Sequence, residues 1–119
     1  MSAKRAGLAV AVMILAMFAP ACGDDSEPAA PPAATVTMTE YAFDPADLTV
    51  PGDARVEVVN AGQEVHTWLI GGTGRGSPDV QPGSRAVLSL EGLAPGRYNV
   101  FCDQPGHAER GQVGTLTIT

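Results

Sequence analysis

Beyond residue 34, the chain consists of short runs in which apolar and polar residues alternate, and turn residues separate these runs. Alternation with a period of two is the pattern of a half-buried strand, and no stretch keeps the period of a helix. Pairs such as Asp44-Pro45 and Pro51-Gly52 are turn signals, because proline fixes φ and glycine accepts a positive φ. Short strands at fairly even spacing predict an antiparallel β-sandwich. The predicted strands are residues 35–39 continued by 41–43, then 48–50, 55–60, 66–70, 85–90, 97–102 and 114–119.

Two segments, one between predicted strands and one within a predicted strand, carry further expectations. Residues 71–78 are so rich in glycine that we expect a mobile loop there. They lack the lysine and following Ser/Thr of a P-loop, so phosphate binding is not predicted. In the run that begins at His66, alternate residues share a face, which places Trp68 in the interior beneath His66. Phe43 is also expected in the core.

Residues 1–21 have the three parts of a secretory signal peptide. Basic Lys4 and Arg5 are followed by an apolar run from Ala6 to Ala19 and then by small residues. A membrane-spanning helix needs about 20 apolar residues, which is longer than this run. We therefore expect the segment to be cleaved.

The cleavage region around Cys22 can be interpreted in two ways. Ala19 and Ala21 fit an ordinary signal peptidase that acts before Cys22. The same residues resemble a bacterial lipobox, in which the cysteine becomes the lipidated N-terminus, although Ala19 stands where leucine is commoner. We favour lipidation of Cys22 and a location on the outer side of the cell membrane. The alternatives are a secreted or periplasmic soluble protein with a free N-terminal thiol, or a disulfide between Cys22 and Cys102.

Residues 22–34 are expected to form a tether, and residues 35–119 a single domain. The tether is rich in proline and acidic residues and has no large apolar side chain to bury. After the leader, the chain has five basic and thirteen acidic residues, a net charge of −8. This charge argues against nucleic acid as a partner.

Candidate metal ligands are concentrated near the C-terminus. Cys102, His107 and Gln112 follow one another at intervals of five residues, in a loop between two predicted strands, and the only other histidine is His66. Two histidines, one cysteine and a weak fourth ligand make up a trigonal copper site of the electron-transfer kind. Zinc is the main rival metal, although glutamine is a poor zinc ligand. Nucleophilic catalysis by Cys102 with His107 would require an open, activated thiolate.

The same residues resemble a known family. The pattern from Phe43 to Asp53, then Asn60-Ala61-Gly62, His66 and the segment from Tyr98 to Gly111, is similar to the cupredoxins, the small blue-copper proteins, over residues 35–119. The resemblance implies a Greek-key β-sandwich of about seven to eight strands that binds one copper ion. By resemblance, redox partners would dock near His107, among small or apolar residues such as Pro105 and Ala108. We expect a monomer.

The ligand set implied by the resemblance is His66, Cys102, His107 and, on the axis, Gln112. Most family members have methionine at the axial position, whereas glutamine occurs in the stellacyanin-like branch. Its oxygen is a harder donor than a thioether and favours Cu(II), so we expect a lower reduction potential than with methionine. Thr67 and Asp103 also replace the commoner Asn and Ser/Thr, which alters the hydrogen bonds around the ligands.

Electron transfer by Cu(I)/Cu(II) cycling is the predicted function. The alternative is an extracytoplasmic module that binds and delivers copper without an electron-transfer role. Only Met38 remains after the leader, so a methionine-rich delivery surface is absent. We do not expect an enzyme, because a catalytic oxidase needs further coppers and the sequence has only two histidines.

Overall fold

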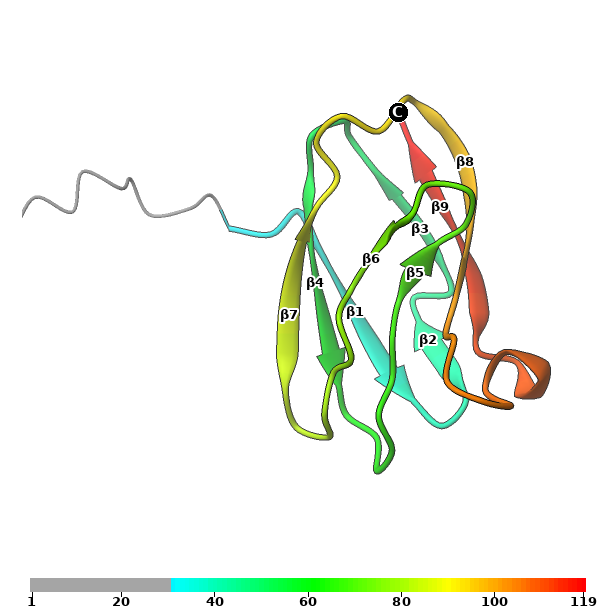
Figure 1. Cartoon of the computed structure of the whole chain (residues 1–119). Helices are drawn as coiled ribbons and strands as arrows, with labels where there is room; N and C mark the ends of the chain where they lie inside the picture. Colours follow the sequence, from blue (N-terminus) through cyan, green and yellow to red (C-terminus); the bar gives the residue numbers. More distant parts are fainter. Residues whose placement is uncertain (1–30) are drawn as a thin grey trace, which may run out of the picture.

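Two β-sheets pack face to face in the computed structural model, which describes residues 31–119 (Figure 1). The predicted β-sandwich is confirmed, with nine strands and one short 3-10 helix in the described residues. None of the helical structure described is long and apolar enough to span a bilayer. The elements are β1 (Ala34–Thr39), β2 (Ala42–Asp44), β3 (Asp47–Val50), β4 (Arg55–Asn60), β5 (Leu69–Ile70), β6 (Arg75–Gly76), β7 (Arg85–Ser89), β8 (Gly96–Phe101), η1 (Ala108–Arg110) and β9 (Val113–Ile118).

Both sheets are mixed rather than antiparallel. One sheet has the order β2-β1-β4-β7 and the other β3-β9-β8-β5-β6. β1 runs parallel to β4, with Val36 opposite Val58, and β3 runs parallel to β9, with Leu48 opposite Leu116. The antiparallel prediction is wrong for these two pairs. Alternation shows which side of a strand is buried, but it does not encode the direction of the neighbouring strand.

Three predicted segments have different boundaries in the structure. Residues 41–43 do not continue the first strand, because the chain reverses and β2 pairs back on β1, with Met38 opposite Phe43. The expected mobile loop at 71–78 contains β6, which pairs with β5. The predicted strand 66–70 is regular only at Leu69–Ile70, while His66 forms an isolated bridge with Val80.

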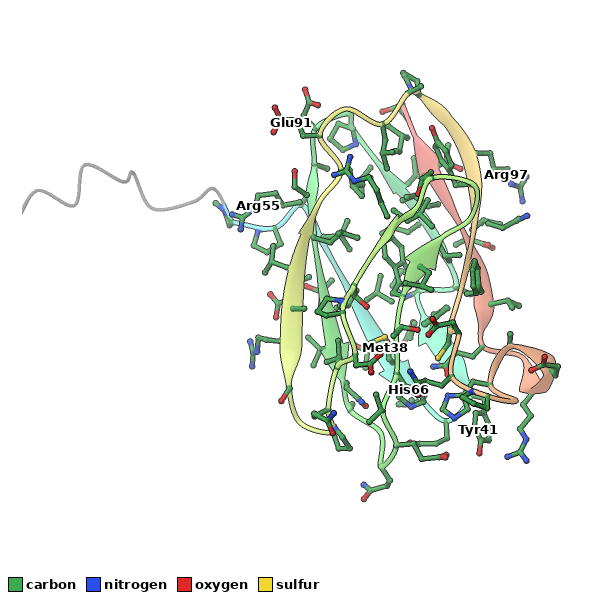
Figure 2. The ribbon with its side chains drawn as sticks, in the orientation of Figure 1. Met38, Tyr41, Arg55, His66, Glu91 and Arg97 are labelled. Atoms are coloured by element: carbon green, nitrogen blue, oxygen red, sulfur yellow. The ribbon has the colours of Figure 1, made fainter. Side chains whose placement is uncertain are left out.

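The core lies between the sheets and extends toward one end of the sandwich. In β4 every second residue is buried, which places Val56, Val58 and finally Asn60 in the interior. Trp68 is buried, as expected, and Figure 2 shows Met38 inside the molecule. The ends of β1, β4 and β8 and the start of β9 lie together, opposite the C-terminus (Figure 1). Polar residues that follow these strands are therefore brought to one place.

Candidate metal centre

The loop between β8 and β9 brings three candidate ligands together. Cys102 directly follows β8, and its N–H donates to the carbonyl of Gln112 at 3.1 Å. The Gln112 N–H in turn donates to the carbonyl of His107 at 3.1 Å. Gly106 and Gly111 have φ of 78° and 111°, values that side-chain-bearing residues rarely adopt. The turns at these glycines fold the loop back on itself.

His66, Cys102 and His107 form a buried cluster at this end of the sandwich. Their ligand atoms all lie within 4.8 Å of one another, and Cys102 Sγ is 3.5 Å from His107 Nδ1. The two imidazole rings are 5.0 Å apart between centroids. Cys102 has no disulfide partner among residues 31–119 and is only 1% exposed. Its partner in the alternative disulfide, Cys22, and the predicted signal peptide lie outside the described residues.

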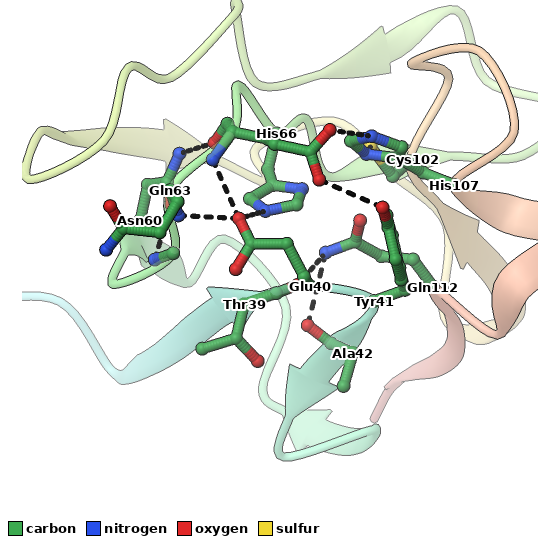
Figure 3. A network of polar contacts seen from close by, with 12 residues as sticks. Thr39, Glu40, Tyr41, Ala42, Asn60, Gln63, His66, Cys102, His107 and Gln112 are labelled. Carbon is green, nitrogen blue, oxygen red and sulfur yellow. Dashed lines mark hydrogen bonds and ion pairs between the residues drawn. The ribbon is translucent and has the colours of Figure 1, made fainter.

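Two buried side-chain atoms among residues 31–119 have no hydrogen-bond partner: His66 Nδ1 and Gln112 Oε1. The Gln112 amide is fixed from its other end, since Nε2 donates to the carbonyls of Thr39 at 2.8 Å and Ala42 at 3.2 Å. In Figure 3, the amide group of Gln112 points toward the side chains of His66 and His107. An unpaired buried acceptor is costly unless something else satisfies it. A free nitrogen, a free amide oxygen and a thiol facing one site fit a metal ion.

Thr67 and Asp103, the two unusual neighbours of the ligands, bond to each other. The Thr67 hydroxyl lies 2.8 Å from Asp103 Oδ1 and accepts the Asp103 N–H at 3.0 Å. The Thr67 N–H also points at Cys102 Sγ, at 3.5 Å. The pair therefore ties the segment of His66 to the segment of Cys102, and it places a donor on the sulfur.

Asn60 holds the turn that leads to His66. Its Nδ2 donates to the carbonyls of Glu64 at 2.7 Å and Val80 at 2.8 Å, and its Oδ1 accepts the Gly62 N–H at 2.8 Å. The side chain is fully buried. The sequence contained a signal for this role, because Asn60 continues the buried alternation of Val56 and Val58, and a buried amide needs several partners.

Glu40 contacts the same turn from the other side and was not identified from the sequence. Its Oε1 accepts the N–H groups of Gln63 at 2.5 Å and Glu64 at 2.7 Å, and it lies 3.2 Å from His66 Nε2 (Figure 3). Desolvation alone would raise the pKa of Glu40. The backbone N–H groups of Glu64, Gln63 and Glu40 itself and the His66 side chain outweigh it and lower the pKa from 4.5 to about 2.

The outer edge of His107 is covered by polar side chains. Tyr41 packs edge-on against the imidazole, with ring centroids 4.9 Å apart, and Glu64 Oε1 lies 3.6 Å from His107 Nε2. Tyr41 Oη donates to Glu64 Oε2 at 3.0 Å and accepts from Arg110 at 2.7 Å. The His107 side chain is 8% exposed. The edge of His107 is therefore lined by polar side chains, and not only by the small or apolar residues that the resemblance implied.

Comparison with known proteins places the chain in a family. Residues 7–118 match the family model of the cupredoxin-like domain. The chain belongs to the cupredoxin-like family. A search of curated protein sequences found no match. The predicted family resemblance is thereby confirmed, and the cofactor associated with it is a single copper ion.

Solved structures with the same fold include three small cupredoxins. A purple cupredoxin from Nitrosopumilus maritimus is 21% identical, with 72% of this chain and 99% of that chain covered and a TM-score of 0.59. Dithionite-reduced auracyanin from Roseiflexus castenholzii is 20% identical, with coverages of 72% and 95% and a TM-score of 0.64. Auracyanin B is 25% identical, with coverages of 75% and 91% and a TM-score of 0.62. This cupredoxin-like chain thus spans almost the whole length of small proteins with the same sandwich.

Proposed function

We propose that this cupredoxin-like protein transfers electrons through one copper ion that cycles between Cu(I) and Cu(II). His66 Nδ1, Cys102 Sγ and His107 Nδ1 would bind the ion, and Gln112 Oε1 would be the weak axial ligand. The observation that carries the proposal is a pair of buried atoms, His66 Nδ1 and Gln112 Oε1, that have no partner in the described part of the chain and lie near the thiol of Cys102. Family membership supports copper as the metal.

The ligand types suit a metal that changes charge by one unit. A thiolate suits Cu(I), imidazoles serve both oxidation states, and a distant amide oxygen perturbs the trigonal set only slightly. Copper supplies the one-electron couple, and the protein supplies a fixed set of donors. Asn60, Thr67 and the amide contacts of Gln112 hold these donors to the backbone, so the site changes little between the two states.

The protein would act as a carrier rather than as an enzyme. Both histidines of the sequence belong to this one site, so no histidine remains for a second copper. Cys102 is 1% exposed, whereas nucleophilic catalysis needs an accessible thiolate. Redox partners would dock over the edge of His107, where Pro105 and Gly106 are exposed.

The carrier would be held outside the cytoplasmic membrane by a lipid on Cys22. This proposal depends on the sequence of residues 1–34 alone. Mass spectrometry of the mature protein from the membrane fraction tests it, with a diacylated N-terminal cysteine expected. An unmodified N-terminal Cys22 in the soluble fraction would contradict the lipid anchor and favour a secreted or periplasmic form.

Voltammetry combined with metal exchange distinguishes the electron carrier from a copper-delivery module. The copper-loaded protein is expected to show a reversible one-electron wave and to lose copper only slowly to a chelator. Rapid transfer of copper to the chelator without a reversible wave would favour delivery. Tighter binding of Zn(II) than of both copper ions would favour the zinc alternative.

A further inference from the structure

Glu40 contacts the ring of His66 as well as the backbone of the neighbouring turn. Its carboxylate follows β1 directly and reaches across to the segment between β4 and β5 (Figure 3). A single oxygen, Oε1, meets two backbone N–H groups and His66 Nε2. The side chain is 26% exposed, whereas His66 is fully buried. A partly solvated carboxylate therefore contacts the ring edge of His66 that faces away from the proposed metal.

The two ring nitrogens of His66 have different partners. Nε2 lies 3.2 Å from Glu40 Oε1, while Nδ1 is buried with no partner in the described part of the chain. A carboxylate accepts hydrogen bonds but cannot donate them. The neutral imidazole must therefore carry its proton on Nε2, and the lone pair of Nδ1 is left for the metal.

The neighbouring turn leaves room for the Glu40 carboxylate. A Cβ at Gly62 would lie 2.5 Å from Glu40 Oε1 and 2.8 Å from Oε2. Gly62 is thus the residue against which the Glu40 carboxylate packs. A methyl group there would push the end of the Glu40 side chain aside without removing its charge.

We propose that Glu40 is a positioning residue for the ligand His66, a role that rests on the copper function proposed above. It fixes the tautomer and orientation of the ring, and its negative charge stabilises Cu(II) more than Cu(I). The consequence is tighter Cu(II) binding and a lower reduction potential. The competing interpretation is that Glu40 only caps the turn at Gln63 and Glu64.

The test uses Glu40→Gln and Gly62→Ala, with Glu57→Gln as the matched control. Gln keeps an acceptor but loses the charge, Gly62→Ala keeps the charge but displaces it, and Glu57 pairs with Arg85 elsewhere. For both site variants, the Cu(II) affinity is expected to fall about 10- to 100-fold. The Cu(I) affinity should fall less, and each tenfold difference between the two raises the potential by about 59 mV. Glu57→Gln should leave both affinities unchanged.

Imidazole nitrogen NMR of the metal-free protein gives a readout that does not depend on copper. Wild-type His66 is expected to be protonated at Nε2 and unprotonated at Nδ1. A proton on Nδ1 would overturn the positioning role. So would site variants that lower the denaturation midpoint but keep the wild-type ratio of Cu(II) to Cu(I) affinity.

The copper-loaded wild type separates the two proposals. If it shows no thiolate-to-copper absorption, the copper function and the role of Glu40 both fail. If it shows this absorption and Glu40→Gln has the wild-type potential, only the role of Glu40 fails.

Discussion

The two histidines of the site have contrasting surroundings. His66 lies beside the sheets, is bridged to Val80, and is held by contacts that Asn60 and Glu40 make from opposite sides. His107 lies on a loop, and the side chains over its edge belong to exposed or half-buried residues, Tyr41, Glu64 and Arg110. We infer that the His66 side provides rigidity and that the His107 side provides the route to a partner. Changes on the first side should therefore affect stability and metal binding more than changes on the second.

Asn60→Ala should give the largest effect, because it removes the main polar support of the His66 side. Three backbone groups lose a partner, although the Val80 carbonyl still accepts the His66 N–H, and each unsatisfied buried group costs about 1–3 kcal/mol. Water will reach some of them, so we expect a loss of about 3 kcal/mol in the free energy of unfolding of the metal-free protein. Denaturant unfolding measures it.

Asn99→Ala is the matched control for Asn60→Ala, because Asn99 is exposed on β8. It should change the free energy of unfolding by no more than about 0.5 kcal/mol. Equal losses in the two variants would contradict the special role of Asn60.

Gln112→Met tests the proposed axial ligand. A thioether is a softer donor than an amide oxygen and favours Cu(I), so the reduction potential should rise. Methionine cannot donate to Thr39 and Ala42, so the metal-free variant should also unfold at lower denaturant. An unchanged or lowered potential would mean that Gln112 is not an axial donor.

Thr67→Val removes the hydroxyl group that connects the segment of His66 to the segment of Cys102. It leaves the Asp103 N–H without its hydroxyl partner, and we expect a loss of about 1–2 kcal/mol in the free energy of unfolding. Thr67→Ser keeps the hydroxyl and should restore most of this loss. If Ser behaves like Val, the hydroxyl does not carry the effect.

Arg110→Ala should have the smallest effect on stability, since it acts on the exposed side of His107. Arg110 lies 4.9 Å from the centroid of the Tyr41 ring and donates to Tyr41 Oη. Such exposed contacts contribute about 0.5–1 kcal/mol. Copper affinity should stay at the wild-type value, while the rate of electron exchange with a small redox reagent should change. A large loss of copper affinity would contradict the division between the two sides.

The sequence predicted the local features of the site better than the distant ones. Cys102, His107 and Gln112 share one loop, so their spacing alone indicated that they converge, and His66 followed as the only other histidine. Glu40 and Tyr41 could not be predicted, because they reach residues more than twenty positions away through the pairing of β1 with β4. The parallel pairing itself leaves no mark in an alternating pattern. Residues 71–78 were expected to be a mobile loop because of their glycines, yet Arg75–Gly76 within this segment pair with β5 as strand β6.

The visible absorption spectrum of the copper-loaded protein tests the central claim most directly. If His66, Cys102 and His107 hold the ion as proposed, Cu(II) should produce an intense thiolate-to-copper band. Reduction to Cu(I) or the substitution Cys102→Ser should abolish this band. A Cu(II) form without the band, or a Cys102→Ser variant that keeps it, would contradict the copper site.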